Sequence, residues 1–225
     1  MRSLPLLLAG ALLSASVSAQ NLSSLSQDEA SDGLKDALEQ SVQLAVKQLG
    51  KPGGFANDPL VRIELPGRLE QAARLMKQVG LGAQADELEK RMNLAAEAAV
   101  PQARTLLAEA VRNMTLADAK GILSGGEDSA TQYLKRSSGE QLRQRFLPIV
   151  AQATEQFDLT QQYNALASQA ATFGMLDNKH GSIEEYVTEQ TLNGLFKVIG
   201  QQEKGIRGNP AAAATGLAQR VLSAH

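Results

Sequence analysis

Between Met114 and Ser137 the chain reads MTLADAKGILSGGEDSATQYLKRS, and this stretch contains the signals of two helix boundaries. Thr115 followed by Asp118 is typical of a helix start, because the hydroxyl accepts from a free backbone N–H and the carboxylate reaches back. The double glycine at 125–126 ends that short helix, since glycine enters left-handed conformations without a Cβ clash. Glu127 and Asp128 follow the glycines. Their negative charges are favourable near the positive N-terminal end of a helix dipole, so they indicate the start of another helix. The stretch therefore predicts a corner between two helices.

Apolar residues recur at spacings of three and four on both sides of this corner, as amphipathic helices require. The first such stripe consists of Leu34, Leu38, Val42, Ala45 and Leu49. We expect an all-α protein: one helical domain of about eight helices over residues 26–225, after a disordered start at 20–25. Residues 60–65 alternate between apolar and polar side chains, and we expect a short extended segment there, without a sheet.

Local signals predict where several helices begin, bend and end. Pro101 lies inside a periodic stretch from 83 to 113, where it removes a backbone hydrogen bond and predicts a kink or a break. We expect Ser138 to begin one helix and Gly205 to end another. Asn209 before Pro210 predicts the start of the last helix.

The first nineteen residues have the pattern of a secretory signal peptide. Arg2 gives a positive start, residues 4–13 are an apolar run, and small residues precede a cleavage site after Ala19. The run is shorter than the roughly 20 residues that span a bilayer. No cysteine follows it, so a lipoprotein is not expected. We predict a periplasmic protein that carries no transmembrane span.

Composition makes several classes of partner poor candidates. The formal net charge is −2 and no basic run follows the leader, which argues against nucleic acid and anionic membrane surfaces as partners. Aromatic residues make up 4% of the chain, with no tryptophan, so a stacking site for sugars or bases is not expected. The chain contains no cysteine, so it has no disulfide and must be stabilised by its core.

A series of short motifs, spread over nearly all of the chain after the leader, resembles domain-of-unknown-function family 4197, a family of exported bacterial helical proteins. The motifs are GLK at 33–35, LP at 65–66, MNLAAE at 92–97, MT at 114–115 with DA at 118–119, AT at 130–131 with Y at 133, FLPIV at 146–150, YVT at 186–188, GLF at 194–196, and IR at 206–207 with NP at 209–210. The resemblance implies an exported all-α protein and carries no activity with it.

Motifs of catalytic and metal chemistry are weak in this sequence. Asp177, His180 and Glu184 lie within eight residues, but their spacing matches no standard zinc or calcium loop, so we predict no metal and no cofactor. A nucleophile needs an adjacent base, and no serine is tied by a motif to His180. We therefore name no catalytic residue.

Polar residues beside the apolar stripes are the candidates for ligand binding. They are Asn93, Glu97, Arg104, Thr131, Tyr133, Tyr186, Glu203, Arg207 and Asn209. One hypothesis is that some of them converge as a polar pocket. The other is that Glu97 and Glu203 each pair with an arginine and join helices together, because buried charges are usually paired.

These observations favour a non-enzymatic protein that binds an envelope protein or a small ligand. Two alternatives stay open: a hydrolase that uses carboxylates, and a carrier of a small apolar ligand enclosed by alanine-lined helices. Each would leave a different feature in the structure. A hydrolase needs a cleft with converging ionisable groups, whereas a carrier needs a closed apolar cavity.

Overall fold

The protein is described by a computed structural model, which places residues 25–78, 80, 82–156, 158–172 and 182–224. The described part is all-α, with nine α-helices, two short 3₁₀ helices and no strand. The helices are α1 (Gln27–Leu49), α2 (Gly67–Gln78), α3 (Ala83–Ala99), η1 (Val100–Gln102), α4 (Ala103–Arg112), α5 (Leu116–Leu123), α6 (Ser129–Gln156), α7 (Leu159–Thr172), α8 (Ile183–Gly208), η2 (Pro210–Ala212) and α9 (Gly216–Ser223).

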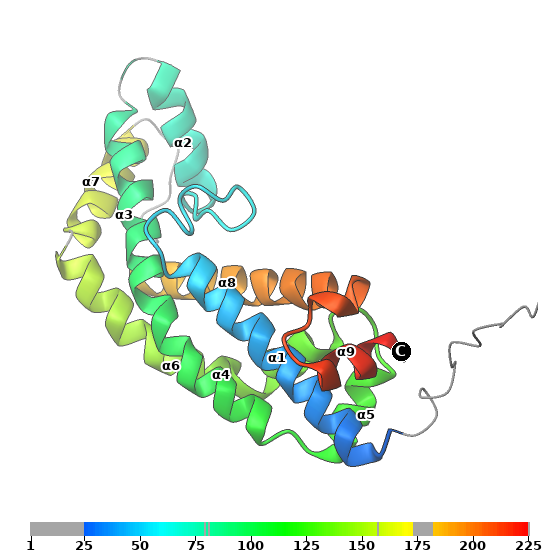
Figure 1. The fold of residues 1–225 in the computed structure, drawn as a ribbon. Coiled ribbons are helices and arrows are strands. Elements are labelled where there is room, and N and C mark those ends of the chain that lie inside the picture. Colours follow the sequence, from blue (N-terminus) through cyan, green and yellow to red (C-terminus); the bar gives the residue numbers. More distant parts are fainter. Residues whose placement is uncertain (1–24, 79, 81, 157, 173–181, 225) are drawn as a thin grey trace, which may run out of the picture.

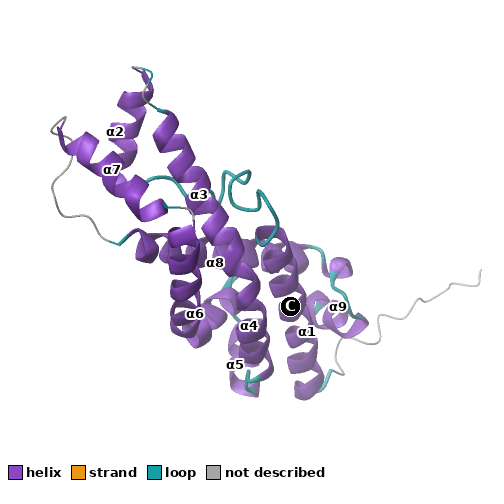
Figure 2. Ribbon diagram, turned by 90° about the vertical axis from the view of Figure 1, so that its left-hand side faces the viewer, coloured by secondary structure: helices purple, strands orange, loops and turns teal. Residues whose placement is uncertain are grey.

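The long helices α1, α3, α6 and α8 form the centre of an elongated molecule (Figure 1). Helix α6 packs against α8 and α3, while α1 packs against α8, α4 and α9. Helices α2 and α7 lie at one end beside the start of α3, and α5 and α9 lie at the other end (Figure 2). Apolar side chains from all four long helices, such as Leu38, Met92, Phe146 and Leu195, are buried in one core.

Two helix starts carry reciprocal side-chain caps, and the one at Thr115 is the cap that the sequence predicts. The Thr115 hydroxyl accepts from the Asp118 N–H at 3.1 Å, and the Asp118 carboxylate accepts from the Thr115 N–H at 3.0 Å. Ser26 and Glu29 make the same reciprocal pair at the start of α1. The double glycine separates α5 from α6, which confirms the predicted corner.

Pro101 interrupts the long helical path from 83 to 112. The chain passes from α3 into the 3₁₀ turn η1 and then into α4, with the proline at the first turn of η1. A tighter turn accommodates the proline, because its nitrogen carries no hydrogen to donate. The predicted break is therefore confirmed.

Residues 62–65 are extended and unpaired with any strand, as the alternation predicts, whereas Leu60 and Val61 of the expected segment belong to a turn after Asp58. Val61, Ile63 and Leu65 are buried, whereas Arg62 and Glu64 point outward. Its apolar side thus belongs to the helical core, and its backbone must find hydrogen-bond partners other than a sheet.

Three predicted boundaries are wrong. Ser138 lies inside α6, where its hydroxyl donates to the Leu134 carbonyl at 2.6 Å instead of capping a helix. Helix α8 continues past Gly205 to Gly208. Asn209 makes no side-chain cap; Pro210 begins only the 3₁₀ turn η2, and Thr215 caps α9. In each case a local signal is overridden by packing that the sequence does not display.

Some predictions fall outside the described residues. They concern the leader at 1–19, residues 20–24 of the disordered start, and the residues Asp177 and His180 of the weak cation motif. Among the helices of the described part, none is both long and apolar enough to cross a membrane.

Candidate functional site

Glu97 on α3 binds the loop that follows α1. Its side chain is 5% exposed, and its Oε1 accepts from the N–H groups of Phe55 at 3.0 Å and Ala56 at 3.3 Å. Its Oε2 accepts from the Gly53 N–H at 3.1 Å. Both oxygens therefore satisfy backbone donors that the loop could not pair internally. Within the described residues Glu97 has no arginine partner, contrary to the ion-pair hypothesis.

Asn93, one turn before Glu97, pairs with the extended segment. Its Oδ1 accepts from the Ile63 N–H and its Nδ2 donates to the Ile63 carbonyl, both at 2.9 Å. The same Nδ2 donates to the Glu89 carbonyl at 2.7 Å. The buried amide thus replaces the neighbouring strand that residue 63 lacks.

Helix α8 binds the same segment from another side. The Tyr186 hydroxyl donates to the Glu64 carbonyl at 2.9 Å, and Lys197 Nζ donates to the Leu60 carbonyl at 3.0 Å. Burial, together with the nearby carboxylates Glu70 and Glu64, raises the pKa of the Tyr186 hydroxyl. Tyr186 therefore stays protonated as a donor over the ordinary pH range.

Glu203 on α8 caps the first turn of α6 from a distance in sequence. Its Oε1 accepts from the Ala130 N–H at 3.1 Å, and its Oε2 accepts from the Thr131 N–H at 2.9 Å. The Thr131 hydroxyl donates to the same Oε2 at 2.6 Å. A carboxylate is favourable here, because the free N–H groups and the positive end of the helix dipole coincide.

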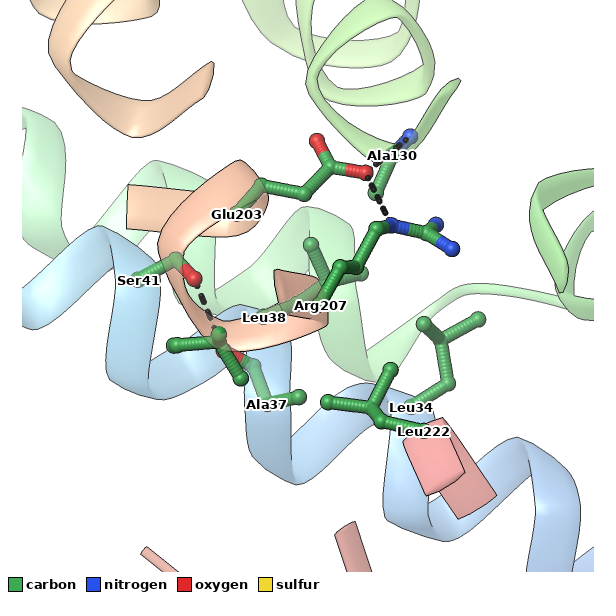
Figure 3. Close-up of a pocket in the computed structure, with 9 residues that line it drawn as sticks. Leu34, Ala37, Leu38, Ser41, Ala130, Glu203, Arg207 and Leu222 are labelled. Carbon is green, nitrogen blue, oxygen red and sulfur yellow. Dashed lines mark hydrogen bonds and ion pairs between the residues drawn. The ribbon is translucent and has the colours of Figure 1, made fainter. Parts of the chain in front are cut away.

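Arg207 completes this cluster, one turn along α8. Its Nε donates to Glu203 at 3.1 Å, which confirms the predicted arginine pairing for Glu203 (Figure 3). Its guanidinium also donates at 3.3 Å to the Ile122 carbonyl and to the Ser129 hydroxyl. The pair therefore joins the end of α5 and the start of α6 to α8, on both sides of the glycine corner.

The cavity beside this ion pair is small. Leu34, Leu38 and Leu222 line it together with Glu203 and Arg207, as Figure 3 shows. Its volume of about 10 Å³ is the space of a single water. The cluster as described has no room for an organic ligand.

Two further candidates have separate positions. The Tyr133 hydroxyl donates to the Ala110 carbonyl at 3.2 Å and so joins α6 to α4. Burial, and to a lesser degree the charge of Asp118, raises the pKa of the Tyr133 hydroxyl. Asn209 is exposed just beyond the end of α8.

Arg104 lies in a different environment, on an open groove between the end of α1 and the start of α4. We call this the α1–α4 groove. Its volume is about 410 Å³, and its charged lining consists of Lys47, Lys51 and Arg104. All three side chains are exposed. None of the three makes an ion pair with an acidic side chain in the part of the chain that is described.

The nine predicted residues thus occupy separate places. Asn93, Glu97 and Tyr186 bind the segment from 53 to 64, whereas Thr131, Glu203 and Arg207 bind the glycine corner. Among the described residues no hydrogen bond connects these two groups. Likewise, the described side chains include no group of three or more histidine, aspartate or glutamate residues suited to a metal ion.

Several residues of these clusters lie in the short motifs that resemble a known family, and a comparison with family models tests that resemblance. The model of the family described as "Protein of unknown function", domain-of-unknown-function family 4197, matches residues 24–223. The chain belongs to this family. No curated protein and no solved structure matches it. In this member of family 4197, Asn93 and Glu97 of the MNLAAE motif bind backbone, and Gly194 of the GLF motif contacts Phe55.

Sequence reasoning missed Lys47 and Lys51 in this family 4197 protein. They flank Gly50 and look like ordinary cations at a helix end, where they oppose the negative end of the dipole. Their proximity to Arg104 depends on how α1 packs against α4, which no local pattern reveals. The only local signal was Pro101, since the bend there brings the start of α4 to the end of α1.

Proposed function

We propose that the chain is an exported, non-enzymatic protein that binds a ligand or partner in the bacterial periplasm. One observation supports the non-enzymatic part of the proposal. In the buried carboxylates Glu97 and Glu203, both oxygens accept hydrogen bonds from backbone N–H groups of the protein itself. A general acid or base must be free to exchange a proton with a substrate. Carboxylates held by backbone N–H groups are poorly suited to that role.

The export part rests on the leader at residues 1–19. Its positive start, apolar run and small-residue cleavage site occur in the order that secretion requires. The absence of cysteine from the chain is compatible with an oxidising compartment, since no thiol is left to oxidise there.

The two alternatives receive less support. A carboxylate hydrolase would need two free acids across a cleft, and the buried acids named above are already bound. An apolar carrier would need an enclosed cavity of ligand size, and the cavity beside Glu203 holds about one water.

The experiment that tests the proposal is native mass spectrometry of the protein released gently from its own periplasm. Cleavage after Ala19 and an added mass, of either small-molecule or protein size, are the expected result. The control is the chain without residues 1–19, produced in the cytoplasm, where the periplasmic ligand would be missing. A protein that stays uncleaved in the cytoplasm, or one that carries no added mass in either sample, contradicts the proposal.

A further inference from the structure

The α1–α4 groove combines two kinds of surface. Its cationic part is formed by Lys47 and Lys51 at the end of α1 and by Arg104 at the start of α4. Its apolar part is formed by Val46, Gly50 and Pro101, which line the same groove. Such a combination suits a molecule with a charged group and an apolar portion.

The charge of the groove is uncompensated. Among the described residues no acidic side chain lines it, although the chain as a whole carries more acidic than basic residues. Elsewhere on the molecule, exposed cations such as Lys77 and Lys204 have carboxylate partners at 2.5 and 2.6 Å. Three cations that share one groove without a counter-charge repel one another, and an anion would relieve that repulsion.

The shape of the groove depends on Gly50, whose lack of a side chain allows a close approach to Pro101. A Cβ on Gly50 would lie 2.9 Å from the Val46 carbonyl oxygen and 3.2 Å from Pro101 Cγ. Glycine therefore lets the ends of α1 and η1 meet, and any side chain at residue 50 would press on the floor of the groove. The resulting volume of about 410 Å³ falls within the range of small-molecule sites, roughly 300–1,000 Å³.

We infer that the α1–α4 groove binds an amphipathic anion, with its phosphate or carboxylate between Lys47, Lys51 and Arg104 and its apolar portion against Pro101 and Val46. This inference rests on the proposed function and names the chemistry of the ligand. The anionic group would form charge-assisted hydrogen bonds with the three cations. Pro101 and Val46 would remove the apolar portion from water. Binding of the whole molecule therefore needs both the cations and this apolar surface.

The test uses decyl phosphate, below its micelle-forming concentration, as the probe. Inorganic phosphate carries the charge without the chain, and decyl maltoside carries the chain without the charge. We expect saturable binding of decyl phosphate, with amide shifts in nuclear magnetic resonance spectra at Gly50, Lys51 and Arg104. Binding should weaken as salt rises from about 20 to about 500 mM, because exposed charges are screened. Equal binding of decyl maltoside, or shifts confined to other residues, overturns the inference.

A matched pair of variants separates the groove from general charge. The first carries Lys47→Ala, Lys51→Ala and Arg104→Ala. The control carries Lys120→Ala, Lys135→Ala and Arg145→Ala, which removes the same charge from exposed positions outside the groove. Exposed ion pairs are each worth up to about fivefold in affinity. We expect the groove variant to bind decyl phosphate at least about tenfold more weakly. The control should change affinity by less than about twofold. Equal affinities of the two variants overturn the inference.

Vesicles of phosphatidylglycerol identify the source of the anion. Sedimentation of the wild-type protein with vesicles, lost in the groove variant, assigns the site to a lipid headgroup. Binding of decyl phosphate without vesicle binding assigns it to a free amphiphile.

The inference about the groove and the proposed function can be refuted independently of each other. If the groove variant keeps the mass added in the periplasm, the ligand binds elsewhere and only the groove is refuted. If decyl phosphate binds the groove of a protein that is never exported, only the proposed function is refuted.

Discussion

Replacing Glu97 by glutamine tests whether the loop after α1 depends on a buried charge. The glutamine has the same shape, but one of its two terminal atoms is a donor. With its oxygen at the Oε1 position, it still accepts from Phe55 and Ala56, while its NH₂ group meets the Gly53 N–H. One charge-assisted hydrogen bond is therefore lost and two become neutral bonds.

The magnitude follows from these three contacts. A hydrogen bond to a charged group contributes about 1.5–3 kcal/mol, and a neutral one roughly half as much. Losing one bond and weakening two lowers the free energy of unfolding by about 3–6 kcal/mol. For a domain of this size, the melting temperature should fall by about 6–24 °C.

Urea unfolding followed by circular dichroism measures this loss, and hydrogen exchange locates it at the amide of Gly53, whose acceptor is removed. The control is Glu109→Gln on the exposed side of α4, which removes the same charge and should change stability by less than about 0.5 kcal/mol. If Glu97→Gln unfolds like this control, or if the Gly53 amide keeps its protection, the reasoning about the buried carboxylate is wrong.

Three further outcomes are expected. Gly194→Ala should lower the free energy of unfolding by about 1–3 kcal/mol in calorimetry, because its Cβ would lie 2.7 Å from buried Phe55 Cε1. An unchanged melting temperature contradicts that contact. Gly139→Ala should instead raise the free energy of unfolding by about 0.5–1 kcal/mol, since the position is helical and nothing lies near the new methyl. A variant less stable than the wild type would contradict this open helical position. Hydrogen bonds from Thr115, first from its hydroxyl and then from its backbone, lower the pKa of Asp118. The resulting stability is present above the ordinary aspartate pKa of about 3.9 and is lost as pH falls through the lowered value. Comparing acid unfolding of wild type and Asp118→Asn checks this, and identical pH profiles count against it.

Much of the fold follows from local signals. Thr115 and Asp118 predict the start of α5, and the stripe of α1 is buried throughout, because caps and periodicity act within a few residues. The prediction that Ser138 begins a helix is wrong, because a serine inside a helix can donate to the carbonyl four residues earlier as readily as it caps a helix start. Packing decides between the two roles.

The sequence predicts which polar residues are buried beside the apolar stripes, but not all of the groups to which they bind. Burial of Glu97 and Glu203 could be inferred from their places beside apolar stripes. Glu97 binds backbone N–H groups 42–44 positions away, and Glu203 binds backbone N–H groups 72–73 positions away, so these partners depend on packing. Arg207, by contrast, lies four residues from Glu203 on the same helix, so that pairing is local. That Lys47 and Arg104 share a groove depends likewise on packing, and the break at Pro101 is the one local signal for it.

The backbone pairing of Ile63 bears on solubility. An extended segment with free N–H and C=O groups is a template on which another chain can add a strand and begin an aggregate. Asn93 occupies both groups of Ile63, and Tyr186 occupies the Glu64 carbonyl. Loss of the Asn93 amide should therefore make concentrated protein associate while its helices are still folded, which light scattering beside circular dichroism would detect. The asparagine keeps a strand-like segment from serving as an edge for a second molecule.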